Sequence, residues 1–98
     1  MTAAEYRSAL VTLGLTQEWA ARLLGVHPLT SHRWATGENR VHETAARFLR
    51  FLLAANITAS TAVDILRIAM PRSKLDQLKR REARTEKAGA FSPQQMRI

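Results

Sequence analysis

Three glycines and a proline break a helical pattern within residues 13–37, and no other feature constrains the fold as strongly. The segment reads LGLTQEWAARLLGVHPLTSHRWATG. Thr16 is suited to cap one helix and Gly25 to end it, because a threonine hydroxyl accepts from a helix N-terminus and glycine adopts positive φ. Pro28 is suited to the first turn of a second helix and Gly37 to its end. We therefore predict two short helices joined by a tight turn, with a steep angle between them.

The rest of the chain shows the spacing of helices rather than strands. Thr2 and Glu5 have the spacing of a capping box. No segment alternates apolar and polar residues with the period of two that marks a strand. The next apolar residues recur at i, i+4 and i+7, as one face of a helix requires: Tyr6, Leu10 and Leu13. The sequence therefore predicts an all-α chain, a compact bundle of five to six helices, whose later helices cover residues 42–55, 59–70 and 74–87.

The composition limits the chemistry of the chain. There is no cysteine, which excludes disulfides and thiolate metal sites, and the three histidines lack the spacing of a metal site. There is no glycine-rich phosphate loop, so we expect neither an enzyme nor a bound cofactor or metal. A polar start, and an apolar stretch that covers only residues 51–57, predict no signal peptide and no membrane span. We expect a cytoplasmic protein without a small-molecule ligand.

Positive charge is concentrated near the C-terminus. The chain carries a net charge of +7, and a chain this basic favours a polyanionic partner. Residues 1–71 hold seven Lys/Arg and five Asp/Glu, a net +2, whereas residues 72–98 hold eight and three, a net +5. This distribution predicts a folded domain over residues 1–71 and a basic extension over residues 72–98 that is partly helical or disordered.

The second helix of the interrupted pair divides into two faces at 100° per residue. Thr30, Ser31 and Trp34 share one side, which we expect to face the core. The other side is chemically mixed and we expect it to be exposed. A short exposed helix held by a tight turn fits the major groove of DNA. The exposed side comprises Pro28, Leu29, His32 and Arg33, with Thr36 between the two faces.

The motif elements of this region are Thr16-Gln17, Ala20-Ala21, Leu24-Gly25-Val26, Arg33-Trp34 and Gly37. Together they resemble the helix-turn-helix of the Cro/phage-repressor family, often called XRE-type regulators, over roughly residues 10–53. The resemblance implies a lambda-repressor-like fold. It also implies that Gln17 contacts the DNA backbone and braces a base-reading residue. By the same resemblance, bases are read from the first turns of the recognition helix: Pro28, Leu29, His32 and Arg33.

Two residues depart from the family pattern. Ser31 stands where the family places Val or Ile, and we expect its hydroxyl to bond the carbonyl one turn back. On that basis Ser31→Val is expected to raise stability. Pro28 offers no hydrogen bond at a position where the family usually has a polar, base-contacting residue. His27 is as well suited to cap the helix as to contact a phosphate. Arg33 is expected to contact a base or a phosphate, since arginine with guanine is the commonest specific pairing. The alternative is a surface arginine whose stem packs on Trp34.

The basic extension offers phosphate contacts of its own. We expect it to follow the DNA backbone beside the groove. Leu75 and Leu78 allow an alternative, in which the segment completes the core or a dimer interface. The complete predicted DNA-binding set is Gln17, His27, Pro28, Leu29, His32, Arg33, Thr36, Arg40, Lys79, Arg80 and Arg81.

The predicted helix over residues 59–70 is capped by Thr58 and ended by Pro71. It is apolar over most of its circumference, so it needs cover on two sides. The body of the domain covers one side, and a second copy of the chain is the expected cover for the other. The alternative cover is the basic C-terminal segment. The predicted dimerisation residues are Val63, Leu66, Ile68 and Met70.

These observations predict a double-stranded DNA-binding transcriptional regulator associated with the nucleoid. We expect a homodimeric repressor that occludes a promoter by placing residues 28–36 in the major groove of a palindromic operator. One alternative is a DNA-recognition or adaptor subunit of a larger phage or mobile-element machine for packaging or recombination. Another is a protein-interaction module that uses residues 59–70 and needs no DNA.

Overall fold

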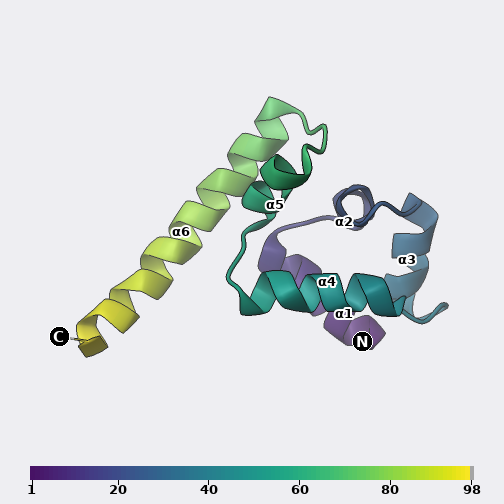
Figure 1. Ribbon diagram of the computed structural model, residues 1–98, viewed down its shortest axis with the longest axis horizontal. Coiled ribbons are helices and arrows are strands. Elements are labelled where there is room, and N and C mark those ends of the chain that lie inside the picture. The colour runs from purple at the N-terminus through teal and green to yellow at the C-terminus, as the bar shows by residue number, and fades with distance from the viewer. Residues whose placement is uncertain (98) are drawn as a thin grey trace.

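The computed structural model describes the backbone of residues 1–97 and the side chains of residues 1–84 (Figure 1). Over residues 1–97 the chain forms helices and turns and no strand, which confirms the all-α prediction. The helices are α1 (Ala3–Leu13), α2 (Gln17–Leu24), α3 (Pro28–Thr36), α4 (Glu43–Ala54), α5 (Ala59–Leu66) and α6 (Arg72–Arg97).

Threonine caps begin three of these helices. At α1 the predicted capping box is present: the Glu5 N–H donates to Thr2 Oγ1 at 3.1 Å, and the Thr2 N–H donates to Glu5 Oε1 at 2.8 Å. The bond from the Thr2 backbone is the main reason that the pKa of Glu5 lies below its ordinary value. Thr16 and Thr58 cap α2 and α5 in the same way, through their side-chain oxygens. The helix starts therefore follow the local sequence, as predicted.

The core forms where α1, α3 and α4 meet. The rings of Tyr6 and Trp34 are both buried and make an edge-to-face contact with centroids 5.7 Å apart. Ser31 is fully buried, so the predicted inward face of α3 is confirmed. Its predicted partner is wrong, however. The Ser31 hydroxyl bonds the Tyr6 hydroxyl at 2.6 Å rather than the carbonyl one turn back, because the phenol reaches it from α1.

α5 is shorter than predicted. It ends at Leu66 rather than at residue 70, and Arg67 follows in the left-handed conformation with φ 55°. Ile68 and Met70 lie in the connection to α6, half-buried against the core. These two side chains therefore pack against the core from the connection rather than from a helix. α4 and α5 meet at a bend of 120°.

α6 is longer than predicted and is docked on the body over its first turns. Leu78 is 2% exposed and belongs to the core, so the alternative role suggested for it in the core is the one observed. Arg81 donates to the carbonyls of Val11 and Thr12 at the C-terminus of α1. Glu82 accepts from the backbone N–H and the hydroxyl of Ser60 at the N-terminus of α5. Neighbouring residues of opposite charge thus bind helix ends of opposite polarity.

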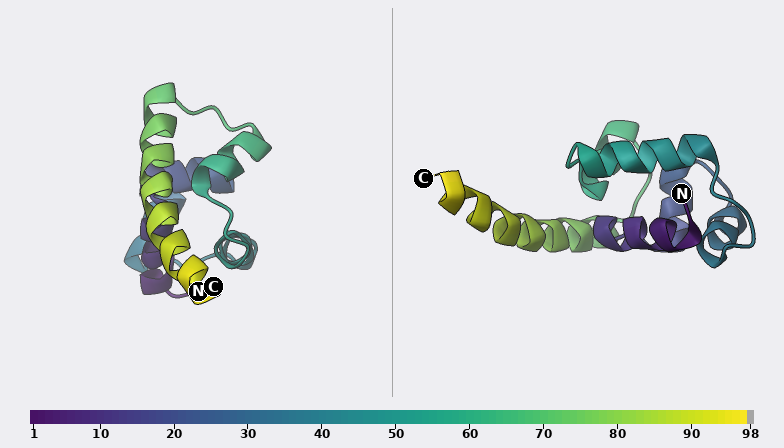
Figure 2. Two further views of the ribbon diagram at one scale, coloured as in Figure 1. Left: turned by 90° about the vertical axis from the view of Figure 1, so that its left-hand side faces the viewer. Right: turned by 90° about the horizontal axis from the view of Figure 1, so that it is seen from below.

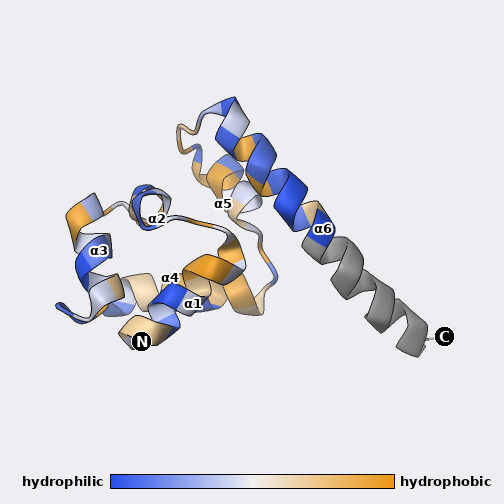
Figure 3. Cartoon of the chain, turned by 180° about the vertical axis from the view of Figure 1, so that it is seen from behind, coloured by the Kyte–Doolittle hydropathy of each residue, from blue (hydrophilic) through white to orange (hydrophobic). Residues whose placement is uncertain are grey.

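The whole chain is elongated, with extents of 47 × 29 × 19 Å (Figure 2). α3 lies at one end, and the free part of α6 projects from the other end in both Figure 1 and Figure 2. Figure 3 shows apolar colouring on α4 and mostly polar colouring along the described part of α6. Among the residues that the structure describes, no single helix is long and apolar enough to cross a membrane. α4 and α5 meet the length and composition only as a bent pair.

Candidate nucleic-acid interface

The turn between α2 and α3 depends on glycine for its backbone angle. Gly25 has φ 74°, and its N–H caps α2 by bonding the Ala21 carbonyl. A Cβ at Gly25 would meet nothing within 4 Å, so the requirement is conformational rather than steric. His27 then caps α3, because its Nδ1 accepts from the Leu29 N–H at 3.1 Å. Pro28 occupies the first turn, as predicted. The turn therefore fixes where α3 begins.

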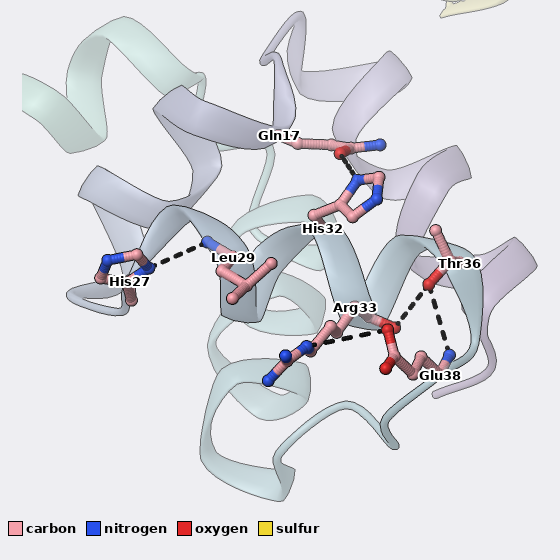
Figure 4. A network of polar contacts seen from close by, with 7 residues as sticks. All are labelled: Gln17, His27, Leu29, His32, Arg33, Thr36 and Glu38. Atoms are coloured by element: carbon pink, nitrogen blue, oxygen red, sulfur yellow. Dashed lines mark hydrogen bonds and ion pairs between the residues drawn. The ribbon is translucent and has the colours of Figure 1, made fainter.

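The outward face of α3 carries the predicted base-reading side chains (Figure 4). Pro28 and His32 are exposed, and Leu29 is 46% exposed. His32 Nδ1 lies 3.0 Å from Oε1 of Gln17, the first residue of α2. An amide oxygen only accepts, so this contact requires a proton on Nδ1 and leaves Nε2 of a neutral imidazole as an acceptor. The structure thus brings Gln17 and His32 together, as bracing requires.

Arg33 is oriented by an acidic neighbour. Its Nε lies 3.7 Å from Oε2 of Glu38, which comes just after α3, and the Arg33 side chain is 42% exposed. The Thr36 hydroxyl donates to the Arg33 carbonyl at 3.2 Å and lies 3.4 Å from the Glu38 N–H, so Thr36 caps the end of α3 (Figure 4). Arg40 is exposed in the connection to α4. Arg33 is therefore held at the surface with its two terminal nitrogens directed away from the backbone of α3 (Figure 4).

The segment that contains α2 and α3 carries equal numbers of positive and negative side chains. Residues 16–43 contain three arginines and three glutamates. Arg22 is paired with Glu18 at 3.5 Å and lies over the Trp19 ring, 4.7 Å from its centroid. Trp19 itself is half-buried, in agreement with a packing role. This segment therefore has no net charge, and Arg7 of α1, which donates to the Ala35 carbonyl of α3, adds a positive charge beside it.

The structure separates the predicted α6 contacts from α3. Lys79 and Arg80 are exposed on the turns of α6 that dock beside α5 and the end of α1, and α3 packs against the first half of α1. Arg81 binds the carbonyls at the end of α1, so its guanidinium contributes to the fold. These three residues do not form one surface with Arg33.

The predicted dimerisation residues also divide. Val63 is 4% exposed and packs in the core of its own chain, so it is not available at the surface. Ile68 and Met70 are half-buried in the connection after α5. Leu66 is 47% exposed and borders an apolar groove that α2, α3 and α4 line. Ile65, which the predicted set omitted, is 67% exposed beside it. The large apolar side chains that α5 exposes are therefore Ile65 and Leu66.

Two contributors to this region were missed by the sequence reasoning. Glu38 directly follows Gly37, which ends α3. A glutamate so close to Arg33 in the sequence was a usable signal for their ion pair. The contact of Tyr6 with Ser31 joins residues 25 positions apart, and no local pattern marks it.

Comparison with protein-family models, curated proteins and solved structures finds no match to this chain. The geometry of the α2–α3 pair therefore stands by itself as the basis for a functional proposal.

Proposed function

We propose that this protein is a sequence-specific double-stranded DNA-binding regulator that represses transcription by covering a promoter. In this proposal α3 enters the major groove of an operator. The observation that carries it is the outward face of α3, where His32 is held by Gln17 and Arg33 extends beside it. A short helix that presents hydrogen-bonding side chains from a rigid turn suits readout of base edges.

Each side chain has a separate role in this mechanism. Arg33 presents a fork of N–H donors that matches the O6 and N7 acceptors of guanine. His32 presents an acceptor, Nε2, that suits the exocyclic amine of adenine or cytosine. Leu29 offers an apolar contact for a thymine methyl. The Glu38 carboxylate beside Arg33 Nε brings a negative charge close to the phosphates of a bound duplex, so it acts against complex formation.

The exposed pair on α5 supports a two-fold dimer in the same proposal. Ile65 and Leu66 are large apolar side chains that water covers in a single chain. A second copy would bury both pairs together with the adjoining groove. A two-fold dimer places two copies of α3 about one turn of DNA apart, and it then reads a palindrome.

Selection of bound duplexes from a random pool tests this function directly. A palindromic consensus with half-sites about one helical turn apart is the expected result. Recovery of sequences with no shared motif would contradict sequence-specific binding. A single non-palindromic motif would retain base reading and contradict the dimer.

Substitution of Arg33 tests which residue reads the sequence. Arg33→Ala is expected to cost about 1–3 kcal/mol at one base position in each half-site and to relax discrimination there. Glu38→Gln is expected to tighten binding, because it removes a negative charge beside Arg33. Arg50→Ala, on the exposed surface of α4, is the matched control. Binding to the consensus and to its single-base variants is the measurement. An unchanged base preference for Arg33→Ala would exclude it as the reader.

A further inference from the structure

The positive charge of the chain lies away from the surface that reads sequence. Residues 16–43 have no net charge, whereas residues 72–98 carry a net +5. Sequence-independent affinity for DNA comes mainly from neutralising phosphates. A chain of this composition therefore carries that affinity on α6 rather than around α3.

The docking of α6 leaves a basic face outward. Leu78 and Glu82 contact the body. Arg80 lies two residues from Leu78, about 200° around the helix, and Arg84 follows one turn later. Both arginines are exposed, as is Lys79. Within the part of the chain whose side chains are described, these three make no hydrogen bond or ion pair with another residue.

The position of this face separates it from a duplex bound at α3. α3 packs against the first half of α1, where Arg7 donates to the Ala35 carbonyl, whereas α6 is anchored at the end of α1 through Arg81 and projects away from α3 (Figures 1 and 2). The major groove is about 8.5 Å deep, so only α3 and the residues beside it enter a duplex seated there. The contacts of Arg81 and Glu82 with two other helices hold α6 in this direction.

We propose that the outer face of α6 binds the phosphate backbone of a second duplex segment, so that one protomer joins two stretches of DNA. This inference rests on the proposed function for the contact at α3. The contact at α6 is independent of sequence in this proposal, because it neutralises phosphates and reads no base edge. Its affinity therefore falls steeply with salt.

The contact at α6 is tested first, with a duplex of random sequence and the full-length protein. The variant is Arg80→Gln with Arg84→Gln, and the matched control removes the same charge from α4 through Arg47→Gln with Arg50→Gln. Loss of two phosphate contacts is expected to flatten the plot of log affinity against log salt by about 1.8. The control is expected to keep the slope of the wild type. Equal slopes for the wild type and the α6 variant would overturn the proposal.

Joining of two duplexes is tested by capture. An immobilised duplex carrying the selected sequence is loaded with protein, and a labelled duplex of random sequence is added. The wild type and the α4 control are expected to retain the labelled duplex. The α6 variant is expected to bind the immobilised duplex and to lose the labelled one. Capture that persists in the α6 variant would overturn the proposal, and so would a wild type that captures nothing.

Failure of the proposed function is distinguishable from failure of this inference. If selection yields no preferred sequence but the salt slope depends on Arg80 and Arg84, the phosphate contact at α6 is supported and sequence-specific binding at α3 is contradicted. If selection succeeds and capture is absent, α3 reads DNA and the second contact is wrong.

Discussion

The hydroxyl groups of Ser31 and Tyr6 share a buried hydrogen bond. Burial raises the pKa of the Tyr6 phenol, and the bond from Ser31 opposes that rise. The folded state therefore favours the neutral phenol, and this contribution to stability is present below about pH 10 and is lost as the pH rises further. The serine at this position is explained because its hydroxyl is the hydrogen-bond partner of the buried Tyr6 phenol.

Ser31→Val is expected to lower the free energy of unfolding by about 1–3 kcal/mol, because the Tyr6 hydroxyl loses its buried partner. The gain from burying added methyl groups, about 1 kcal/mol, does not compensate. The observed contact thus reverses the direction expected from the family pattern. Urea denaturation measures the change. Adding Tyr6→Phe is the control, since removal of both hydroxyls should restore most of the stability. A Ser31→Val protein more stable than the wild type would contradict the role of this bond.

Gln17 sets the hydrogen-bonding character of His32. Gln17→Ala is expected to reduce discrimination at the base that His32 reads by about 1 kcal/mol, because Nδ1 no longer needs to carry the proton. Gln17→Leu fills a similar volume without an acceptor and should lose the preference to the same extent. Affinities for the four base pairs at that position are the measurement. Equal discrimination by Gln17→Ala and the wild type would show that Gln17 does not orient the ring.

Helix starts could be predicted from the sequence because caps are local. Thr2, Thr16 and Thr58 each bond an N–H three residues later. The end of α5 could not be predicted in this way. Arg67 takes the left-handed conformation there, and Ile68 and Met70 pack against the core from the connection that follows. The outward face of α3 could be predicted from periodicity alone. The anchoring of Arg81 could not, since its partners are backbone carbonyls at the end of α1, about 70 positions earlier in the chain.

Gly25→Ala tests the turn between α2 and α3. The substitution is expected to cost about 1–2 kcal/mol of stability, because an alanine Cβ disfavours φ 74° although the surrounding space is open. Gly25→Asn should cost less, since asparagine tolerates this conformation. Thermal unfolding followed by circular dichroism compares the two. Equal stability of the alanine variant and the wild type would mean that the turn adopts another backbone angle.

For the whole molecule, α6 contributes to stability as well as charge. Truncation after residue 71 removes Leu78, Arg81 and Glu82, and is expected to cost at least about 2 kcal/mol of unfolding free energy. Truncation after Arg84 keeps all three and should leave the melting temperature close to that of the full chain. Scanning calorimetry compares the two proteins. If the shorter protein melts with the full chain, α6 is not part of the cooperative fold.

The anchors of α6 also order the events of protein synthesis. The ends of α1 and α5 gain their charged partners only after the ribosome has added Arg81 and Glu82, near the end of the chain. The place that Leu78 fills in the core is likewise vacant until then. Because chains fold from the N-terminus as they emerge, the α2–α3 pair is made well before the core is closed. A nascent chain that stalls before residue 78 therefore carries a complete α2–α3 pair on an incompletely closed body.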